Sequence, residues 1–312
     1  MKKAPVIILL VFASVAFCSC NKLTTGNITN KTLEIKEPFQ VLELRDDISV
    51  SLIHCDASHK AGDIHIKTGE NLIDNINAET GRHFEINENG DTTRFTKLVV
   101  TNDNTFNNFR PHNHEPQMTI YYDTLYKIIF YSNSLNIHTD TLRGYLSLTH
   151  FANDTIEWDS LAPNLILDVQ GGSGNFNILV NCYKLMTKYI HGTSILTIKG
   201  TATLASTYAD YDCHGVIDSK ELESHIHYIT THSTNIIKAR TSYLLDVLNN
   251  NIGEVHYQKY FTEKKYYFWN DSLHQTDSIV RTVVCPEVIH YNGEYLDPWT
   301  YNNEKSGLQK LP

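Results

Sequence analysis

The chain of 312 residues lacks the basic footprint that a nucleic-acid-binding protein needs. It has 26 Lys and Arg against 35 Asp and Glu, a formal net charge of -9 at pH 7. Long hydrophobic runs are also missing, because the apolar stretch from Val6 to Phe17 is too short to cross a bilayer as a helix. We therefore expect no nucleic-acid partner and no membrane-spanning helix.

Cysteine is scarce, and its spacing excludes the common metal-binding and redox motifs. Two of the six cysteines, Cys18 and Cys20, lie in the N-terminal segment, and the others are far apart without any Cys-x-x-Cys pair. Those four could form disulfides in three pairings or remain buried thiols, and the sequence leaves both open. They are Cys55, Cys182, Cys213 and Cys285.

The N-terminus has the order of parts found in a targeting segment. Basic residues up to Lys3 precede the apolar stretch, and a small residue then precedes Cys20, which resembles a lipobox. We expect residues 1–19 to be a lipoprotein signal peptide, Cys20 to carry the lipid, and the polar residues 20–32 to be a tether. An ordinary secretory signal on a soluble protein is the alternative. The lipid would anchor the chain to the outer membrane of a Gram-negative cell envelope, on the periplasmic or the surface side.

Helical periodicity is almost absent, and short alternating strands take its place. Val41 to Leu44, Ile48 to Leu52 and Ile64 to Ile66 alternate apolar with polar residues, and only Asn71 to Ile76 could form a helical turn. From about residue 128, short strand cores recur every 19 to 21 residues. They are Leu135 to Ile137, Ile156 to Trp158, Phe176 to Ile178, Leu196 to Ile198, Ile217 to Ser219, Ile236 to Lys238 and Val255 to Tyr257.

A repeat this short cannot bury its apolar side alone. Stacking successive units so that like strands pair in parallel does bury it, which predicts an all-β fold of the β-solenoid type with about 20 residues per turn. An antiparallel sandwich with strands at similar spacing is the alternative.

The repeat also resembles a known family. The stretch from Gly192 to Gly200 has the apolar strand and Gly-Thr/Ser corner of the putative auto-transporter adhesin head GIN domain family, and Leu244 to Tyr257 is similar to its closing stretch. The resemblance implies a right-handed parallel β-helix in an envelope protein with an adhesin or binding role. We assign it to residues 33–257 and expect 258–312 to be a C-terminal cap and tail.

Two groups of residues could carry chemistry. Asp210 and Asp212 are two apart, so on a regular strand both would point the same way, as in a polysaccharide lyase or hydrolase. His225 and His227 could likewise share a strand face and form half of a zinc site. Neither group has further ligands or a basic cluster beside it in sequence. We therefore expect no enzyme activity, no cofactor and no metal, and both pairs to be solvated strand residues.

Six Asp-Ser/Thr-apolar triplets resemble an acceptor sequence for O-glycosylation in some Gram-negative bacteria. Ordinary turn chemistry at the entry to a strand explains them equally well. The candidate acceptors are Thr124, Thr141, Thr155, Ser160, Ser272 and Ser278.

The last part of the chain is rich in aromatic residues, notably at 260–261 and 266–269. We expect residues 258–291 to cover the end of the solenoid. An exposed platform that stacks on carbohydrate is the second interpretation. For the whole chain the sequence predicts a lipid-anchored envelope adhesin or binding module that takes a glycan or protein ligand. A lyase or hydrolase on a β-helix, or a structural envelope component, are the alternatives.

Overall fold

The computed structural model describes residues 26–45, 48–86, 90, 92–103, 116–131, 136–142, 165–270 and 275–311. The predicted signal peptide and Cys20 lie outside these residues. The described chain is almost entirely β-structure, with one 3-10 helix at Ile73–Asn75 where the sequence predicted a helical turn. Among the described residues, no helix is long and apolar enough to span a membrane. The all-β prediction is therefore confirmed.

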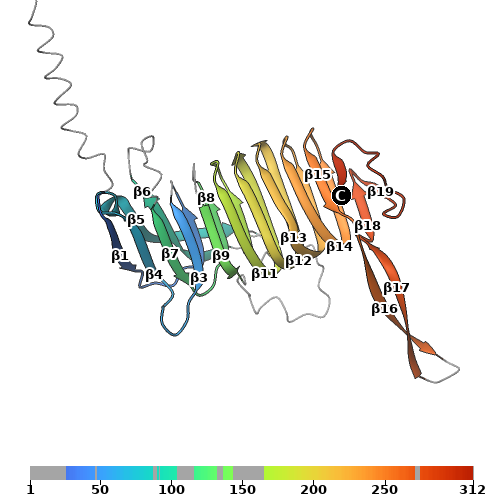
Figure 1. Ribbon diagram of the computed structural model, residues 1–312, viewed down its shortest axis with the longest axis horizontal. Helices are drawn as coiled ribbons and strands as arrows, with labels where there is room; N and C mark the ends of the chain where they lie inside the picture. The colour runs from blue at the N-terminus through green and yellow to red at the C-terminus, as the bar shows by residue number, and fades with distance from the viewer. Residues whose placement is uncertain are drawn as a thin grey trace, which may run out of the picture.

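The described residues form twenty strands, numbered in chain order (Figure 1). They are β1 (Ile28–Glu34), β2 (Val41–Leu44), β3 (Ser49–His54), β4 (Asp63–Gly69), β5 (Ile76–Ile86), β6 (Thr92–Asn102), β7 (Gln117–Tyr122), β8 (Lys127–Phe130), β9 (Asn136–Leu142), β10 (Leu165–Val169), β11 (Asn175–Gly192), β12 (Ile195–Cys213), β13 (Val216–Thr231), β14 (Ile236–Asn249), β15 (Glu254–Gln258), β16 (Tyr260–Asn270), β17 (Gln275–Cys285), β18 (Val288–Tyr291), β19 (Glu294–Leu296) and β20 (Leu308–Leu311).

The long strands β11 to β14 pair in parallel, each with the next one along the chain. The two halves of one long strand can pair with different partners. The first half of β11, for example, pairs with β9 and the second half with β10. Strands from β1 to β15 lie side by side along the long axis of the molecule (Figure 1). Strand cores that are regularly spaced in the sequence thus lie on neighbouring strands that pair in parallel.

The core follows from this register, because it places apolar side chains of successive strands next to one another. Leu196 pairs with Phe176 on one side and with Ile217 on the other, and Ile237 and Val255 continue the row. All five side chains are fully buried. The strand cores predicted at these positions are confirmed, since neighbours in the row are 18 to 21 residues apart in sequence.

One of the predicted strand cores does not fit this order. The core at 156–158 lies outside the described residues, and Phe176 pairs directly with Ile137, so no strand from 156–158 lies between β9 and β11. The strand β10 follows at Leu165 and pairs with β8 and β11. Strands β9 and β11 are therefore direct neighbours although the paired residues Ile137 and Phe176 are 39 apart in sequence, an interval that the regular spacing did not predict.

The first strands join the row out of chain order. Strand β2 lies between β6 and β8, and β3 lies between β7 and β9, with all four pairings parallel. At this end of the molecule the parallel rows are closed by antiparallel strands, because β4 pairs with β7, β1 with β4, and β5 with β6. Strand β1 begins at Ile28, within the segment predicted as a tether, so part of that segment belongs to the folded sheet.

The opposite end is closed by the last residues of the chain. Strand β18 pairs with β14 and β20 with β15, both in parallel, and Tyr301 and Leu308 are buried. Residues 292–311, expected as part of a tail, therefore contribute to the core. Strands β16 and β17 pair only with each other, and their hairpin projects from this end of the row (Figure 1).

Candidate functional site: the aromatic hairpin

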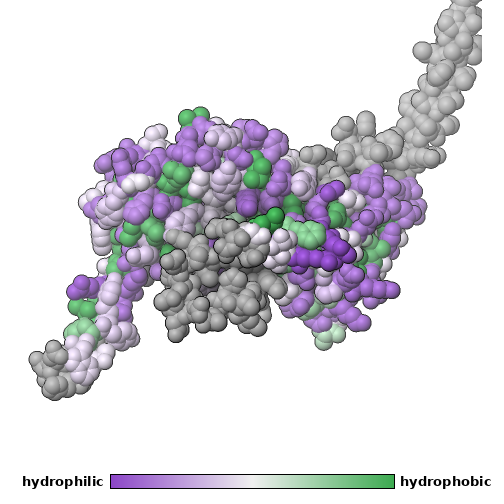
Figure 2. All heavy atoms as spheres, turned by 180° about the vertical axis from the view of Figure 1, so that it is seen from behind, coloured by the Kyte–Doolittle hydropathy of each residue, from purple (hydrophilic) through white to green (hydrophobic). Residues whose placement is uncertain are grey.

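The projecting hairpin exposes a dense group of aromatic side chains. From behind, Figure 2 shows a mostly hydrophilic surface on the row of strands, and the hairpin extends beyond it with pale and hydrophobic residues. Large apolar side chains normally become buried on folding, so a dense exposed group of them indicates a binding surface. We therefore take the hairpin as the candidate functional site.

Strand alternation divides the aromatic residues between two faces. Tyr267 and Trp269 are two apart and project from one face, whereas Tyr266 and Phe268 project from the other. The antiparallel register with β17 places Tyr267 opposite Ser278 and Tyr266 opposite Ile279. Consecutive aromatic residues therefore give each face two rings, about 7 Å apart along the strand.

The face of Tyr267 and Trp269 is the more exposed one. Tyr267 is 68% and Trp269 59% exposed, against 42% for Tyr266 and 47% for Phe268. The ammonium group of Lys265 lies 5.3 Å from the Tyr267 ring centroid, which is cation-π geometry. This face combines open ring surfaces with a charged hydrogen-bond donor beside them.

The same face continues to the base of the hairpin. Phe261 lies on it, and its ring centroid is 5.9 Å from that of Trp299, which belongs to the turn after β19. Lys259 donates a hydrogen bond to the Trp299 carbonyl oxygen at 3.1 Å. An aromatic surface therefore runs from the strand tips toward the folded end of the row. Residues 260–270 and 275–283 extend away from the row of strands. This agrees with the interpretation of the aromatic residues as an exposed platform.

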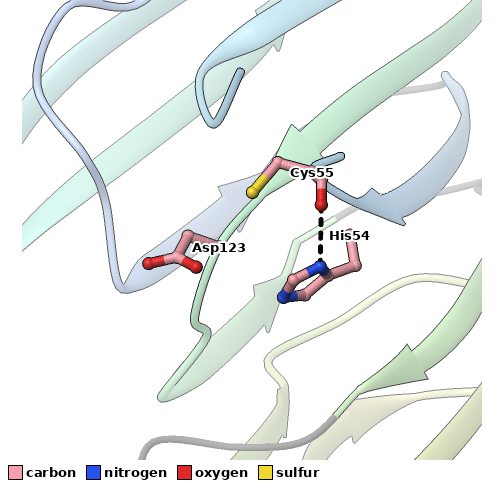
Figure 3. A group of neighbouring side chains, drawn as sticks. All are labelled: His54, Cys55 and Asp123. Atoms are coloured by element: carbon pink, nitrogen blue, oxygen red, sulfur yellow. Dashed lines mark hydrogen bonds between the residues drawn. The ribbon is translucent and has the colours of Figure 1, made fainter. Parts of the chain in front are cut away.

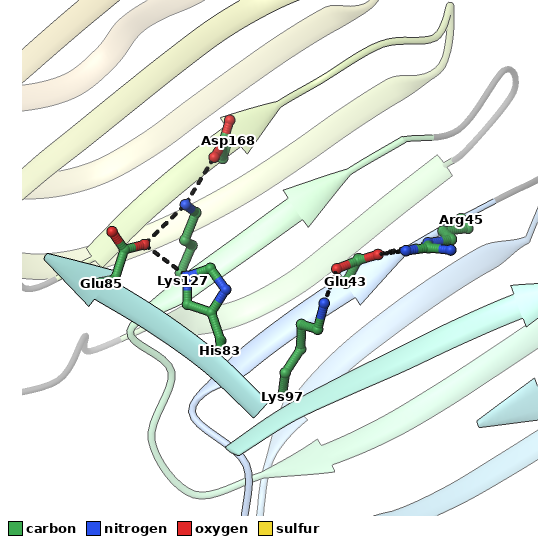
Figure 4. Close-up of polar contacts among 7 residues, drawn as sticks. All are labelled: Glu43, Arg45, His83, Glu85, Lys97, Lys127 and Asp168. Atoms are coloured by element: carbon green, nitrogen blue, oxygen red, sulfur yellow. Dashed lines mark hydrogen bonds and ion pairs between the residues drawn. The ribbon is translucent and has the colours of Figure 1, made fainter. Parts of the chain in front are cut away.

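A cluster of charged side chains lies where β5 crosses the outer side of β8 and β10 (Figure 4). Lys127 is buried, and its ammonium group contacts Asp168 at 2.9 Å and Glu85 at 3.0 Å. His83 contacts the same Glu85 oxygen at 2.8 Å. Burial alone would lower the pKa of Lys127, but the two carboxylates outweigh it and raise the pKa, so the ammonium stays charged.

Glu43, on the neighbouring strand β2, has a similar environment. Its carboxylate is buried and accepts hydrogen bonds from Lys97 and Arg45, both at 2.6 Å. Burial raises the pKa of Glu43, but these two bonds outweigh the burial and hold it below its ordinary value. Each buried carboxylate in Figure 4 thus has a cationic partner, which indicates a structural network that fixes β5 and β6 on the sheet.

The network could not be assembled from the sequence, because its members come from different strands. The available signal was a charge inside an apolar strand, as in Lys127 before two isoleucines or Asp168 within Leu-Ile-Leu-Asp-Val. The apolar residues around such a charge predict that both faces of the strand are buried, so the charge needs a buried partner. It does not identify the partner.

The two aspartates considered for catalysis do not form a regular pair. The register between β11 and β12 shifts between Tyr189 and His191, so Asp210 and Asp212 lie at an irregularity. Asp210 accepts a hydrogen bond from the Tyr211 amide, and Asp212 contacts His191 at 3.8 Å. The expectation that both project from one face of a regular strand is therefore wrong.

The two histidines of β13 are also separated. The register shifts between Ser224 and Ile226, so His225 is exposed and stacks on Tyr243, whereas His227 is fully buried. His227 contacts the Thr207 hydroxyl at 2.9 Å, and burial lowers its pKa to about 4. The pair cannot share a metal ion, and the solvated interpretation holds for His225 alone.

The candidate glycosylation sites fall partly on described residues. Thr124 is exposed in the turn between β7 and β8, Thr141 lies in β9 and Ser278 is partly exposed in β17. Thr155, Ser160 and Ser272 lie outside the described residues. The cysteines Cys55, Cys182, Cys213 and Cys285 are free thiols, so the buried-thiol alternative holds for the last three.

Comparison with solved structures supports the fold. A putative adhesin from Bacteroides fragilis is similar over 74% of this chain and 88% of its own, with a TM-score of 0.52 and 17% identity. A putative adhesin from Parabacteroides merdae (75% and 89% covered, TM-score 0.42, 17% identity) and a putative lipid binding protein from Parabacteroides distasonis (92% and 98% covered, TM-score 0.44, 16% identity) are more distant. No family model matches the sequence, and no curated protein matches it.

Proposed function

We propose that the chain is a lipid-anchored adhesin or binding module of the cell envelope, without enzyme activity, and that the aromatic hairpin is its ligand-binding surface. The Bacteroides fragilis protein that shares the fold is described as a putative adhesin, and the proposal extends that role to this chain. The parallel ladders with neighbours 18 to 21 residues apart support a parallel β-helix as the scaffold, and we propose the right-handed form.

The hairpin is the observation that carries the proposal. Tyr267 and Trp269 present open ring faces on one side of a two-stranded sheet. The apolar C–H face of a sugar ring stacks on such a surface, and Lys265 beside it can donate to sugar hydroxyl groups. A glycan is therefore the ligand that the geometry favours.

The position of the hairpin agrees with an anchored adhesin. Strand β1 lies at one end of the row and the hairpin projects from the other (Figure 1). A lipid on Cys20, eight residues before β1, would hold the first end at the membrane. The aromatic surface would then face away from that membrane, where a ligand on another surface can reach it.

The test uses residues 21–312, which retain β1, on an array of glycans and extracellular-matrix proteins. We expect saturable glycan binding that weakens at least tenfold in the double variant Tyr267→Ala/Trp269→Ala, since two aromatic contacts of about 1 kcal/mol each are lost together. The matched control is Tyr266→Ala/Phe268→Ala, which removes two rings from the other face of the same hairpin. It should change affinity less than about threefold.

Other outcomes separate the alternatives. Binding that both double variants leave intact would move the site away from the hairpin, and binding to matrix proteins alone would replace the glycan with a protein ligand. An Asp210→Asn/Asp212→Asn variant is assayed in parallel. Glycan cleavage that this variant abolishes would make the protein an enzyme, and absence of all binding would favour a structural envelope role.

A further inference from the structure

A second potential site lies at the end of β3, far from the hairpin. His54, Cys55 and Asp123 each direct one potential ligand atom into the same space, and these three atoms lie within 4.8 Å of one another. Figure 3 shows the thiol and the imidazole turned toward the Asp123 carboxylate. Within the described residues, the ligand atoms of these His, Cys and acidic side chains lie close enough together to hold one metal ion.

The β-sheet register explains why these residues meet. Strands β3 and β7 run in parallel with His54 opposite Tyr122, so the residues that follow, Cys55 and Asp123, are also neighbours. The Cys55 amide donates a hydrogen bond to the Tyr122 carbonyl oxygen at 2.7 Å, which extends the pairing by one residue. Because β3 ends at His54, Cys55 is free of strand alternation and both side chains can turn toward the same side.

Two contacts hold the His54 imidazole in place. Nδ1 of His54 lies 2.9 Å from the Cys55 carbonyl oxygen, and its ring packs edge-on against Tyr122. A carbonyl oxygen only accepts, so Nδ1 is the protonated nitrogen in this contact and the lone pair of a neutral ring is on Nε2. Metal-bound histidines usually donate their second nitrogen to a carbonyl or carboxylate in this way.

The donor set selects the kind of metal. A thiolate and an imidazole favour zinc over magnesium or calcium, and a carboxylate completes a common set of zinc ligands. Tetrahedral coordination needs ligand atoms about 3.5 Å apart, so the atoms must approach by about 1 Å. Asp123 is exposed and Cys55 is only partly buried, so small side-chain rotations can supply this movement.

We propose that His54, Cys55 and Asp123 bind one zinc ion, with water as the fourth ligand. The ion would join the end of β3 to the end of β7. It would therefore stabilise the part of the molecule where the first strands join the row out of chain order.

Zinc and cobalt(II) binding to the full chain tests the proposal directly. The protein is purified in detergent with a non-thiol reductant, freed of metal with a chelator, and titrated with zinc chloride by calorimetry. We expect one zinc per chain, an increase in the Tm on addition of zinc, and a thiolate-to-metal charge-transfer band with cobalt chloride. Cys55→Ser, His54→Gln and Asp123→Asn should each weaken zinc binding at least tenfold, and Cys55→Ser should abolish the band.

A neighbouring histidine provides the matched control. His59 stacks on Tyr121 with ring centroids 4.1 Å apart, and Tyr121 and Tyr122 project from opposite faces of β7. His59→Gln should therefore leave zinc affinity within about threefold. Stoichiometric binding that all three ligand variants retain, loss of binding in His59→Gln alone, or no binding by the unaltered chain would each overturn the proposal.

Discussion

At the scale of single residues, Gly200 shows how closely neighbouring strands approach in the row. Its φ is +105°, and a Cβ atom there would lie 2.0 Å from the carbonyl oxygen of Val180 on the adjacent strand. Both the backbone conformation and the close contact exclude a side chain.

Replacing this glycine should destabilise the fold strongly. We expect Gly200→Ala to lower the free energy of unfolding by about 2 kcal/mol or more, measured by urea denaturation. Gly81→Ala is the matched control, because Gly81 lies within β5 and a Cβ atom there would have no neighbouring atom within 4 Å. Equal effects of the two substitutions would contradict the argument from close approach.

His227 gives the core a dependence on pH. It occupies a row of the core between Ala205 and Leu245, and burial lowers its pKa to about 4 from an ordinary value of 6.5. The unfolded chain therefore takes up a proton at a higher pH than the folded chain does. The stability linked to this residue is fully present above pH 6.5 and is lost as the pH falls from 6.5 toward 4, by about 3 kcal/mol.

The variant His227→Leu should remove this contribution. Its stability relative to the unaltered chain is expected to improve steadily between pH 6.5 and 4, as measured by urea denaturation at several pH values. His225→Gln, at an exposed position on the same strand, should keep the original pH dependence. A difference between His227→Leu and the unaltered chain that stays constant over this range would show that His227 does not titrate on unfolding.

At the scale of elements, the ion pairs of Lys127 connect β5, β8 and β10. Its side chain is 9% and that of Asp168 6% exposed, so loss of the cation leaves a buried carboxylate without its cationic partner. We expect Lys127→Met to lower the free energy of unfolding by about 3 kcal/mol or more, and Lys127→Met/Asp168→Leu to recover most of that loss. Urea denaturation of the single and double variants measures both effects.

An exposed pair on the same sheet is the control for this prediction. Lys199 and Glu221 lie 2.8 Å apart on adjacent strands, with both side chains about half exposed. Lys199→Met should change stability by less than about 1 kcal/mol, because solvent screens the pair. If the two lysine variants lose equal stability, burial is not what gives the Lys127 network its effect.

The elements also show what the sequence could and could not predict. A core position repeats every 18 to 21 residues, and this pattern alone indicates parallel stacking; its members are Phe176, Leu196, Ile217, Ile237 and Val255. The predicted core at 156–158 has the same spacing and apolar content as the other cores. Spacing cannot show that β11 pairs directly with β9, because strand pairing is a long-range property.

The candidate site was predictable in composition but not in position. The aromatic residues at 266–269 are plain in the sequence, and so is the need to cover the end of the row. The sequence could not show that one set of residues covers the end of the row while the aromatic residues form a separate exposed surface. The cover comes from Tyr301 and β20, which leaves the aromatic residues exposed on the hairpin.

At the scale of the whole molecule, both ends of the row need closure, since an open end exposes core side chains and unpaired backbone groups. Val255 and Tyr257 in β15 are buried, and β20 pairs with that strand. Truncation after Leu296 removes β20 and Tyr301 together. We therefore expect the truncated chain to have a lower Tm and to self-associate as its concentration rises, as measured by light scattering coupled to size-exclusion chromatography.

A variant with a shortened hairpin is the control for this prediction. In a second variant, Asn-Gly replaces residues 265–280 between Lys264 and Arg281, which face each other across the two strands and can be joined by a two-residue turn. This variant loses about as many residues as the truncation but keeps the closed end. It should retain the oligomeric state and Tm of the unaltered chain, because the removed residues form no ladder with the row. Self-association of the shortened-hairpin variant, with none in the truncated chain, would reverse the roles that we assign to the hairpin and the last strand.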